Sequence, residues 1–458
     1  MNEHGLAVVI CNYNKKEYLR TNLRSLSAQT VSDFDIYVVD NASEDGSADM
    51  VKQEFSDKAR VIRNPINLGG SGGFNVGMRE AMKKPYEFLI LLDNDVTLKE
   101  DCVEVLRRDM RLNPDIGIMG AKILRMDKPD IIQDFAPTIN YNDLSFALDH
   151  TGEKDCSTFP HLADCEYVAA CGLIVRRSVI ERIGYFPEEN FIYFDDVTWN
   201  IRCRRAGMRV VSNSQAVLWH KGGYLDDSDT FVTYYSIRNK LRFFMTYDCA
   251  KAPDNSKVPD RERRIFFILR DVFEGIYVGE WKGLTSSVRT RMDAFLDAIF
   301  GVSGKAEAYK IRMRKKVPDA LENAVRQAKS ITLYENGFPE SAGRILTRIE
   351  AIIRHVGGTA RTEIIEGRGD AFSNPPRFIY DENGNLILHA CKHICRLDID
   401  CFERFWVDEW GNVILSESDY LKCREYPAAF RRFRMLFEDR IRDCMEQIGG
   451  DYSSVRRT

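Results

Sequence analysis

Short apolar stretches alternate with amphipathic stretches of helical length over the first 95 residues. The short stretches are rich in β-branched residues, which favour strands, and the longer ones place apolar residues three or four apart, as one helix face requires. Strands separated by helices are typical of βαβ units in a parallel sheet. The predicted strands are residues 6–13, 35–40, 59–63 and 87–92.

The alternation continues to about residue 245 and predicts an α/β fold. A helix is expected at 99–112, where Asn-Pro ends it, and another at 197–207. Further strands are expected at 116–124, 167–176 and 209–219.

Beyond residue 245 the pattern changes twice. Long helical patterns come first, at 264–277, 289–300, 309–328 and 342–355. Past residue 357, residues 378–388 recur as 405–415 with seven of eleven positions identical, and each copy carries Gly-Asn between apolar stretches, a hairpin signal. We therefore expect three regions: an α/β domain at 1–246, a helical extension at 247–357, and a small α+β region at 358–458 with two similar hairpins and a helix at 428–447.

The composition is that of an ordinary globular protein, with 44% hydrophobic and 29% charged residues. The net charge of −4 gives no bias toward nucleic acid, so no nucleic-acid partner is expected. The longest apolar stretches, 6–11 and 168–175, are far shorter than the roughly 20 residues of a membrane span, and no signal peptide is visible. The 12 scattered cysteines fit a reduced, cytoplasmic compartment.

Asp93 and Asp95 stand two residues apart at the carboxyl end of a predicted buried strand. Ligands of open α/β sheets bind at that edge, and a hard divalent cation is typically held by one or two carboxylates plus substrate phosphates. The simpler interpretation is a polar turn after a strand.

Four glycines in five residues open a predicted helix at 69–73. Glycines permit close backbone approach, and a helix start offers free amide groups to phosphate. The spacing is not that of the dinucleotide-binding fingerprint, and a flexible connection is the alternative.

Three further features are each ambiguous alone. Asp40 ends the second predicted strand, where it can accept a proton from a base imide or from ribose, or simply form an Asx turn. Asp195 and Asp196 begin a helix, where acids commonly cap. His220 follows Trp219 at a strand end, where a histidine is more often structural than catalytic.

Taken together and in this order, these motifs resemble the inverting family-two glycosyltransferases of the GT-A fold, above all the bacterial rhamnosyl- and galactofuranosyltransferases. The resemblance covers about residues 6–245 and rests on residues 11–14, 40–47, 67–74, 93–95, 195–196, 219–220 and 234–239. It implies a mostly parallel sheet with helices on both faces. Gly70 stands where rhamnosyltransferases have an apolar residue, which favours the galactofuranosyltransferase side.

The resemblance also implies roles for individual residues. Asp93, Asp95 and His220 would hold Mn²⁺ or Mg²⁺ against the donor diphosphate. Asp196 would be the catalytic base, with Asp195 as the alternative, while Thr198 replaces an acid that the family often has. The nucleotide sugar would contact a set of residues at the strand ends and in the glycine-rich turn: Asn12, Asp40, Arg63, Asn67, Gly70, Gly72, Gly73 and Asp93.

The implied activity is transfer of a galactofuranose- or rhamnose-like sugar from a UDP- or dTDP-sugar to a cell-surface or polyprenyl-linked glycan. Two alternatives stay open: a catalytically silent glycan-binding or scaffolding protein, and a nucleotidyltransferase, which would need a basic loop where residues 11–14 stand. The expected location is the cytoplasm or the inner face of the plasma membrane. The oligomeric state is left open.

Two segments outside the resemblance invite a function. Residues 261–270 mix arginines with aromatics and could contact an anionic membrane surface, although a core-facing helix with a solvated basic edge is the favoured interpretation. His389, Cys391, His393 and Cys395 alternate as in a strand, a spacing too regular for the usual zinc knuckle, so zinc is the less favoured interpretation there.

Overall fold

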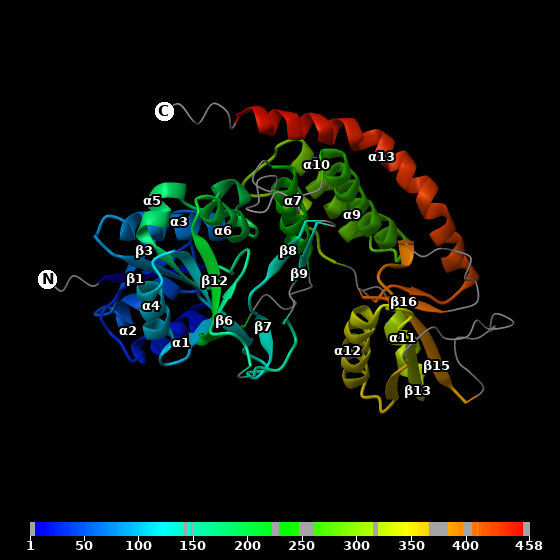
Figure 1. Cartoon of the computed structure of the whole chain (residues 1–458), viewed down its shortest axis with the longest axis horizontal. Helices are drawn as coiled ribbons and strands as arrows, with labels where there is room; N and C mark the ends of the chain where they lie inside the picture. The colour runs from blue at the N-terminus through cyan, green and yellow to red at the C-terminus, as the bar shows by residue number, and fades with distance from the viewer. Residues whose placement is uncertain are drawn as a thin grey trace. The chain divides into compact units, whose positions relative to one another are not determined.

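The computed structural model describes residues 5–141, 144–147, 150–156, 158–221, 229–246, 260–314, 319–365, 383–396, 405–409 and 411–451. The chain divides into two compact units (Figure 1). The first contains the chain up to Ile268, Met292–Arg312 and the part from Asp439 onward, and the second contains Leu269–Arg291 and Met313–Glu438.

The first unit is built on a ten-stranded mixed sheet with the main order β10-β12-β6-β11-β4-β1-β2-β3. Its parallel half consists of β1 (Leu6–Asn12), β2 (Asp35–Asp40), β3 (Ala59–Arg63) and β4 (Phe88–Asp93). Strand β11 (Gly172–Arg176) runs antiparallel between β4 and β6 (Ile116–Arg125), and β12 (Arg209–His220) is parallel to β6.

Short strands complete this sheet and add a separate hairpin. Strand β10 (Leu162–Asp164) forms the edge beside β12, while β5 (Val96–Leu98) pairs with β12 and β7 (Ile132–Asp134) with β6. Strands β8 (Thr138–Asn140) and β9 (Ser145–Ala147) pair only with each other.

Helices cover both faces of the sheet (Figure 1). Helices α1 (Lys16–Ser27), α2 (Ser47–Glu54) and α4 (Cys102–Leu112) pack on one face. The other face is covered by α3 (Gly69–Ala81), α5 (Arg177–Ile183) and α6 (Asp195–Arg205). Successive residues of β1 alternate between the two cores, as the two-residue period of a strand requires.

The glycine-rich start of α3 lets this helix lie close to the sheet. A Cβ on Gly73 would stand 2.3 Å from Cys11 Sγ, and one on Gly77 would stand 2.3 Å from Val9 Cγ1. Real Cβ atoms do not approach so closely, so larger residues at either position would push α3 away from β1. Close packing is therefore one function of these glycines.

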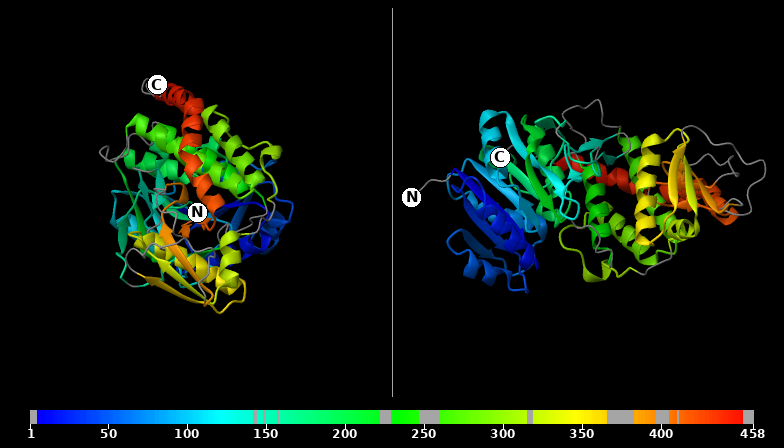
Figure 2. Two further views of the ribbon diagram at one scale, coloured as in Figure 1. Left: turned by 90° about the vertical axis from the view of Figure 1, so that its right-hand side faces the viewer. Right: turned by 90° about the horizontal axis from the view of Figure 1, so that it is seen from below.

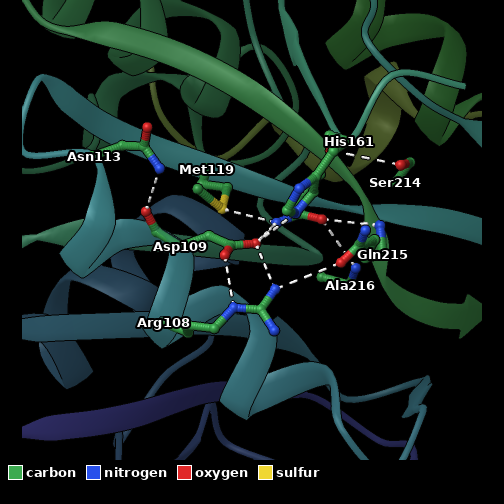
Figure 3. A network of polar contacts seen from close by, with 9 residues as sticks. Arg108, Asp109, Asn113, Met119, His161, Ser214, Gln215 and Ala216 are labelled. Carbon is green, nitrogen blue, oxygen red and sulfur yellow. Dashed lines mark hydrogen bonds and ion pairs between the residues drawn. The ribbon is translucent and has the colours of Figure 1, made fainter.

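A buried carboxylate ties α4 to the sheet near the start of β12 (Figure 3). Asp109, only 2% exposed, accepts hydrogen bonds from Arg108 Nε at 2.8 Å and Asn213 Nδ2 at 2.7 Å and lies 2.7 Å from His161 Nε2. Burial alone would raise the pKa of Asp109, but these three partners outweigh it and hold the pKa below its usual range. The charge is thus compensated inside the fold.

Longer helices follow the sheet along the chain: α7 (Phe231–Met245), α9 (Arg261–Trp281) and α10 (Thr285–Ile299). Arg264, at the start of α9, is 9% exposed and donates to the Phe244 carbonyl at 3.2 Å, while Arg261 pairs with Glu446 at 2.9 Å. These contacts fit the interpretation of residues 261–270 as a packed helix. Within the described ranges, no helix combines the length and apolar character needed to cross a membrane.

The second unit contains a five-stranded sheet in the order β14-β13-β15-β16-β17 (Figure 2). Strands β14 (Arg361–Ile365), β13 (Ser330–Tyr334), β15 (Asn385–Cys391) and β16 (Trp406–Asp408) are parallel. Strand β17 (Val413–Ile414) closes an antiparallel hairpin with β16. Helices α11 (Ala320–Gln327) and α12 (Pro339–His355) pack on this sheet, and α13 (Glu417–Asp451) follows it in sequence.

The α/β class and the largely parallel sheet are confirmed, and the first four predicted strands agree with the structure to within one residue at each end. The strand predicted at 167–176 is shorter, Gly172–Arg176. The helix predicted at 309–328 was wrong over 309–314, where the structure has a 3₁₀ turn at Ala308–Lys310 and then irregular chain. Of the described residues in this range, only Ala320–Gln327 form an α-helix.

In the C-terminal part, β13 was not predicted, and it lies inside the region expected to be helical. The second copy of the repeat forms the predicted hairpin. The first strand of the first copy lies outside the described residues. Among the described residues, His389, Cys391, His393 and Cys395 do not converge on a common metal position, so the zinc interpretation gains no support. The boundaries at residues 246 and 357 stay a prediction.

Candidate active site

The predicted site residues of the first unit gather where the parallel strands end. Asn12 ends β1, Asp40 ends β2, Asp93 ends β4 and His220 ends β12. Strands β2, β1 and β4 are parallel neighbours, so their carboxyl ends meet at one edge of the sheet, where ligands of α/β proteins bind. Strand β12 lies further along the sheet, and its pairing with β5, which places His220 opposite Val96, brings the histidine close to the turn that carries Asp93 and Asp95.

Asn12 and Asp40 form a buried polar pair at this edge. Asn12 Nδ2 lies 3.4 Å from Asp40 Oδ1 and 3.2 Å from Ser43 Oγ, and Asn12 Oδ1 accepts from Asn94 Nδ2 at 2.8 Å. Asp40 is 4% exposed and Asn12 is fully buried. The sequence prediction did not include Asn94, which connects this pair to the turn between Asp93 and Asp95.

Asn41 organises the loop that leads into α3. Its Oδ1 accepts from Leu68 N and Asn64 Nδ2, each at 3.0 Å, and its Nδ2 donates to Gly69 O at 2.9 Å and Asn67 Oδ1 at 3.0 Å. The side chain of Asn67 is therefore already hydrogen-bonded within the protein, to Asn41. Arg63 instead forms an ion pair with Asp49 of α2, which does not support its predicted contact with the donor.

Asp93, Asp95 and His220 come together as predicted. His220 Nε2 lies 3.2 Å from Asp95 Oδ1 and 3.8 Å from Asp93 Oδ2. Lys15, which the sequence prediction missed, forms an ion pair with the other oxygen of Asp95 at 2.6 Å. The side chain of Asp93 is 39% exposed, whereas that of Asp95 is 3% exposed, so Asp93 is the one of the two acids that is open to a ligand.

The two acids have opposite pKa shifts. Loss of hydration, with the nearby negative charge of Asp95, outweighs the effect of His220 and raises the pKa of Asp93 to about 6. Burial acts in the same direction on Asp95, but its contacts with His220 and Lys15 outweigh that effect and hold the pKa of Asp95 well below its usual range. Asp95 is therefore the more firmly ionised acid.

Strand β7 brings Gln133 and Asp134 close to His220. Gln133 Nε2 lies 2.9 Å from His220 Nδ1, while Gln133 Oε1 is buried without a hydrogen-bond partner among the described residues. If the Gln133 amide is turned over, Gln133 Oε1 accepts the proton on His220 Nδ1. The other ring nitrogen, His220 Nε2, then keeps a free electron pair that faces the two acids. The histidine is thus held in a way that fits metal coordination. Asp134 is an additional acid, and loss of hydration raises its pKa to about 7.

Asp195 and Asp196 begin α6, and they differ in what they contact. Ser71 donates a hydrogen bond to Asp195 Oδ2 at 2.7 Å. Burial raises the pKa of Asp195, and this effect outweighs the lowering by the hydrogen bond from Ser71. Asp196 accepts from Ala170 N at 3.2 Å and Val197 N at 2.7 Å. Loss of hydration and the adjacent charge of Asp195 raise the pKa of Asp196 to about 7. A carboxylate with that pKa is suited to act as a base near neutral pH.

The segment just before α6 is strained. Phe191, Tyr193 and Phe194 have φ values of 65°, 65° and 64°, in the left-handed region that bulky residues rarely adopt. Asn239 of α7 donates from Nδ2 to the carbonyls of Asn190, Ile192 and Tyr193 at 3.0, 2.7 and 3.0 Å. The side chain of Asn239 therefore holds the strained turn that presents the two acids.

Arg238, fully buried beside Asn239, donates to Asn190 O at 2.9 Å and Gly304 O at 2.8 Å. The sequence had shown these two residues only as part of the motif at 234–239. Ser71 likewise lay unremarked inside the glycine-rich run. No sequence signal pointed to Gln133 or Asp134, because strand order alone brings β7 to His220.

Comparison with known proteins finds similarity in the part of the chain that carries this site. Residues 7–171 match the family described as Glycosyl transferase family 2. The chain is 31% identical over 202 residues to an uncharacterized glycosyltransferase of Nostoc sp. (strain PCC 7120), covering 43% of this chain and 56% of that protein. It is 24% identical over 197 residues to the galactofuranosyltransferase GlfT2 of Mycolicibacterium smegmatis, covering 39% and 30%. The chain thus spans about half and about a third of the lengths of these relatives.

The similarity to solved structures is partial. S. aureus TarS 1-349 in complex with UDP-GlcNAc is 14% identical with a TM-score of 0.42, covering 64% of this chain and 81% of that one. GalNAc-T7 with UDP, GalNAc and Mn²⁺ is 13% identical with a TM-score of 0.44, covering 58% and 50%. The match to the family model covers residues 7–171 of the 458 residues.

Proposed function

We propose that the chain is an inverting glycosyltransferase, because residues 7–171 match the family described as Glycosyl transferase family 2. It takes a galactofuranose- or rhamnose-like sugar from a UDP- or dTDP-sugar and transfers it to a cell-surface or lipid-linked glycan. The observation that carries the proposal is the grouping of Asp40, Asp93 and His220 at the strand ends, with Asp196 near enough to Asp93 for the charge of Asp93 to raise the pKa of Asp196. The sequence similarity to a named galactofuranosyltransferase supports the sugar class.

The nucleotide binds over the ends of β1 and β2. Asp40 can accept the N3 proton of uracil or thymine, and Asn12 holds the Asp40 carboxylate in place. A purine such as adenine would present an acceptor to the same carboxylate and would be bound less well. The glycine-rich start of α3 follows the loop that Asn41 holds. The amides of Gly69 and Ser71 already donate to Asn67 Oδ1 at 2.8 Å and to the Phe191 carbonyl at 3.2 Å, so the half-buried Gly70 is the position from which this turn would contact the donor.

Asp93, Asp95 and His220 would hold a divalent cation against the donor diphosphate, and their oxygen and nitrogen atoms fit Mn²⁺ or Mg²⁺. When bound, the cation would neutralise the charge that develops on the leaving nucleotide. Gln133 and Lys15 orient His220 and Asp95, respectively.

Asp196 is the base that takes the proton of the acceptor hydroxyl as this hydroxyl attacks the anomeric carbon. One base and one displacement invert the anomeric configuration, as in inverting glycoside hydrolysis. The two amide groups on Asp196 fix its direction, and the hydrogen bond from Ser71 keeps Asp195 aside from the acceptor.

The test is donor turnover by the purified chain. A panel of UDP-, dTDP-, GDP- and ADP-sugars is incubated with Mn²⁺, and free nucleoside diphosphate is measured with and without chelator. We expect chelator-sensitive release from a pyrimidine donor, which Asp196→Asn strongly reduces and Asp115→Asn leaves unchanged, because Asp115 lies at the opposite end of β6 paired with Arg209. Release in the presence of chelator, or preference for a purine donor, would contradict the proposal.

A further inference from the structure

Cys171 lies directly beside the proposed metal position. It precedes β11, and its carbonyl accepts a hydrogen bond from the amide of Asp93 at 3.3 Å. The two strands pair in antiparallel fashion with Gly172 opposite Leu92, so Cys171 and Asp93 are neighbours across the sheet. The residue is 6% exposed and belongs to neither the proposed nucleotide contacts nor the proposed base.

The thiol completes a group of three ligand atoms. One carboxylate oxygen of Asp93, Cys171 Sγ and one ring nitrogen of His220 all lie within 4.8 Å of one another. Within the described ranges, no other histidine, cysteine and acid side chains converge in this way. Ligands at roughly 2.0–2.3 Å from one cation lie about 3–4 Å apart, so modest side-chain rotation closes this group around an ion.

Asp95 is not part of this group of three ligand atoms and makes other contacts. One of its oxygens is 2.6 Å from Lys15 Nζ and the other is 3.2 Å from His220 Nε2, so its charge is already compensated. Asp95 therefore shares its charge with Lys15 and His220 as well as with a bound cation, whereas the thiol of Cys171 has no hydrogen-bond partner among the described residues.

We propose that Cys171 is a ligand of the cation bound by Asp93 and His220, and that the site therefore prefers a thiophilic divalent cation such as Zn²⁺, Co²⁺ or Cd²⁺ to Mg²⁺. The proposal rests on the metal site of the proposed function and specifies its composition. The thiolate is the form that binds metal, so the thiol proton passes to solvent as the metal–sulfur bond forms, and nothing is oxidised or reduced. A soft sulfur ligand selects the softer cations over hard ones that prefer oxygen.

The first experiment is a Co²⁺ titration of the metal-free protein, followed by near-ultraviolet absorption. A sulfur-to-cobalt charge-transfer band is expected with the wild-type chain and with Cys102→Ala, a buried cysteine of α4 outside the group. The band is expected to be absent with Cys171→Ser and Cys171→Ala. In competition titrations, Cys171→Ser should weaken Cd²⁺ binding by about ten-fold or more and Mn²⁺ binding much less. An unchanged band and unchanged Cd²⁺ affinity in both Cys171 variants would overturn the proposal.

A second measurement needs no variant. X-ray absorption of the wild-type chain loaded with one equivalent of Zn²⁺ should show a sulfur neighbour at about 2.3 Å. A shell of nitrogen and oxygen alone would refute Cys171 as a ligand even if its variants fail to fold. If Mn²⁺ binds and supports donor turnover in that case, the proposed function stands and only the sulfur ligand is wrong. If no divalent cation binds the wild-type chain, the metal site of the proposed function fails as well.

Discussion

Replacing Asn239 by Ala removes the side chain that holds the turn before the catalytic acids. Its amide has two protons but serves three carbonyls, those of Asn190, Ile192 and Tyr193. In the variant, Asn190 O keeps Arg238 at 2.9 Å and Tyr193 O keeps Asn190 Nδ2 at 3.4 Å. The Ile192 carbonyl is left without the donor that it has in the wild-type chain.

The size of the effect follows from these contacts. An unsatisfied buried group costs about 1–3 kcal/mol, and a bulky residue in the left-handed region costs about 1–3 kcal/mol as well. Three such residues stand in this turn, so the lost restraint is comparable to the strain of one of them. We therefore expect the turn to relax and Asp196 to move. A loss of about 1.4 kcal/mol in the transition state lowers the rate ten-fold.

The assay is steady-state donor turnover at several pH values. For Asn239→Ala we expect kcat to fall about ten-fold or more with KM for the donor nearly unchanged, because the nucleotide contacts lie at β1 and β2. Ser236→Ala on the same helix is the control and should behave as wild type. A lower melting temperature with unchanged kcat and an unchanged pH profile would show that Asn239 only stabilises the fold.

Four other variants test the site. Asp196→Asn should lower kcat by about 100-fold or more at unchanged donor affinity, and Asp195→Asn should lower it by less. The wild-type rate should fall below pH 7, because Asp196 has a pKa of about 7 and its protonated form cannot act as a base. A larger loss in Asp195→Asn would reverse the assignment. Asp95→Ala should abolish metal-dependent turnover, and full activity with chelator present would contradict this. Asp134, with a folded-state pKa of about 7, binds its proton more tightly in the folded state, so stability falls as pH rises from about 4 to 7. Asp134→Asn should therefore melt higher than wild type at pH 8 but not at pH 4; equal melting at both would refute the shift.

The sequence predicted those site residues that lie at the ends of regular strands. Asn12, Asp40 and Asp93 end three neighbouring parallel strands, and the apolar pattern located each end to within a residue. Once the strands are known to be parallel neighbours, their ends must meet. His220 was also found at a strand end, with a family resemblance to support it.

Contacts that depend on strand order could not be predicted in the same way. Strand β11 enters the sheet antiparallel between β4 and β6, which brings Cys171 to Asp93, and nothing in the local pattern of residues 167–176 gives that direction. Strand β7 brings Gln133 to His220 by a similar pairing. Arg63 forms an ion pair with Asp49 that the sequence pattern did not indicate, and its contact with the donor stays a prediction.

Secondary-structure prediction was least accurate between residues 309 and 334, where one long helix was expected and a strand was missed. Residues 309–328 carry enough apolar residues at helical spacing to predict one long helix, yet among those that the structure describes only Ala320–Gln327 form an α-helix. The following strand, Ser330–Tyr334, alternates apolar and polar residues over only five positions and lies between β14 and β15 in its sheet. Its burial comes from β14 and β15, whose pairing with it joins segments far apart in the sequence.

The anomeric configuration of the first sugar product tests the central claim most directly. The chain is incubated with a pyrimidine nucleotide sugar, metal and an acceptor, or with water as acceptor, and the anomeric proton of the product is followed by time-resolved nuclear magnetic resonance before mutarotation. A single displacement assisted by Asp196 predicts the configuration opposite to that of the donor. A product that retains the donor configuration would contradict the mechanism, because retention needs two displacements or a front-face attack.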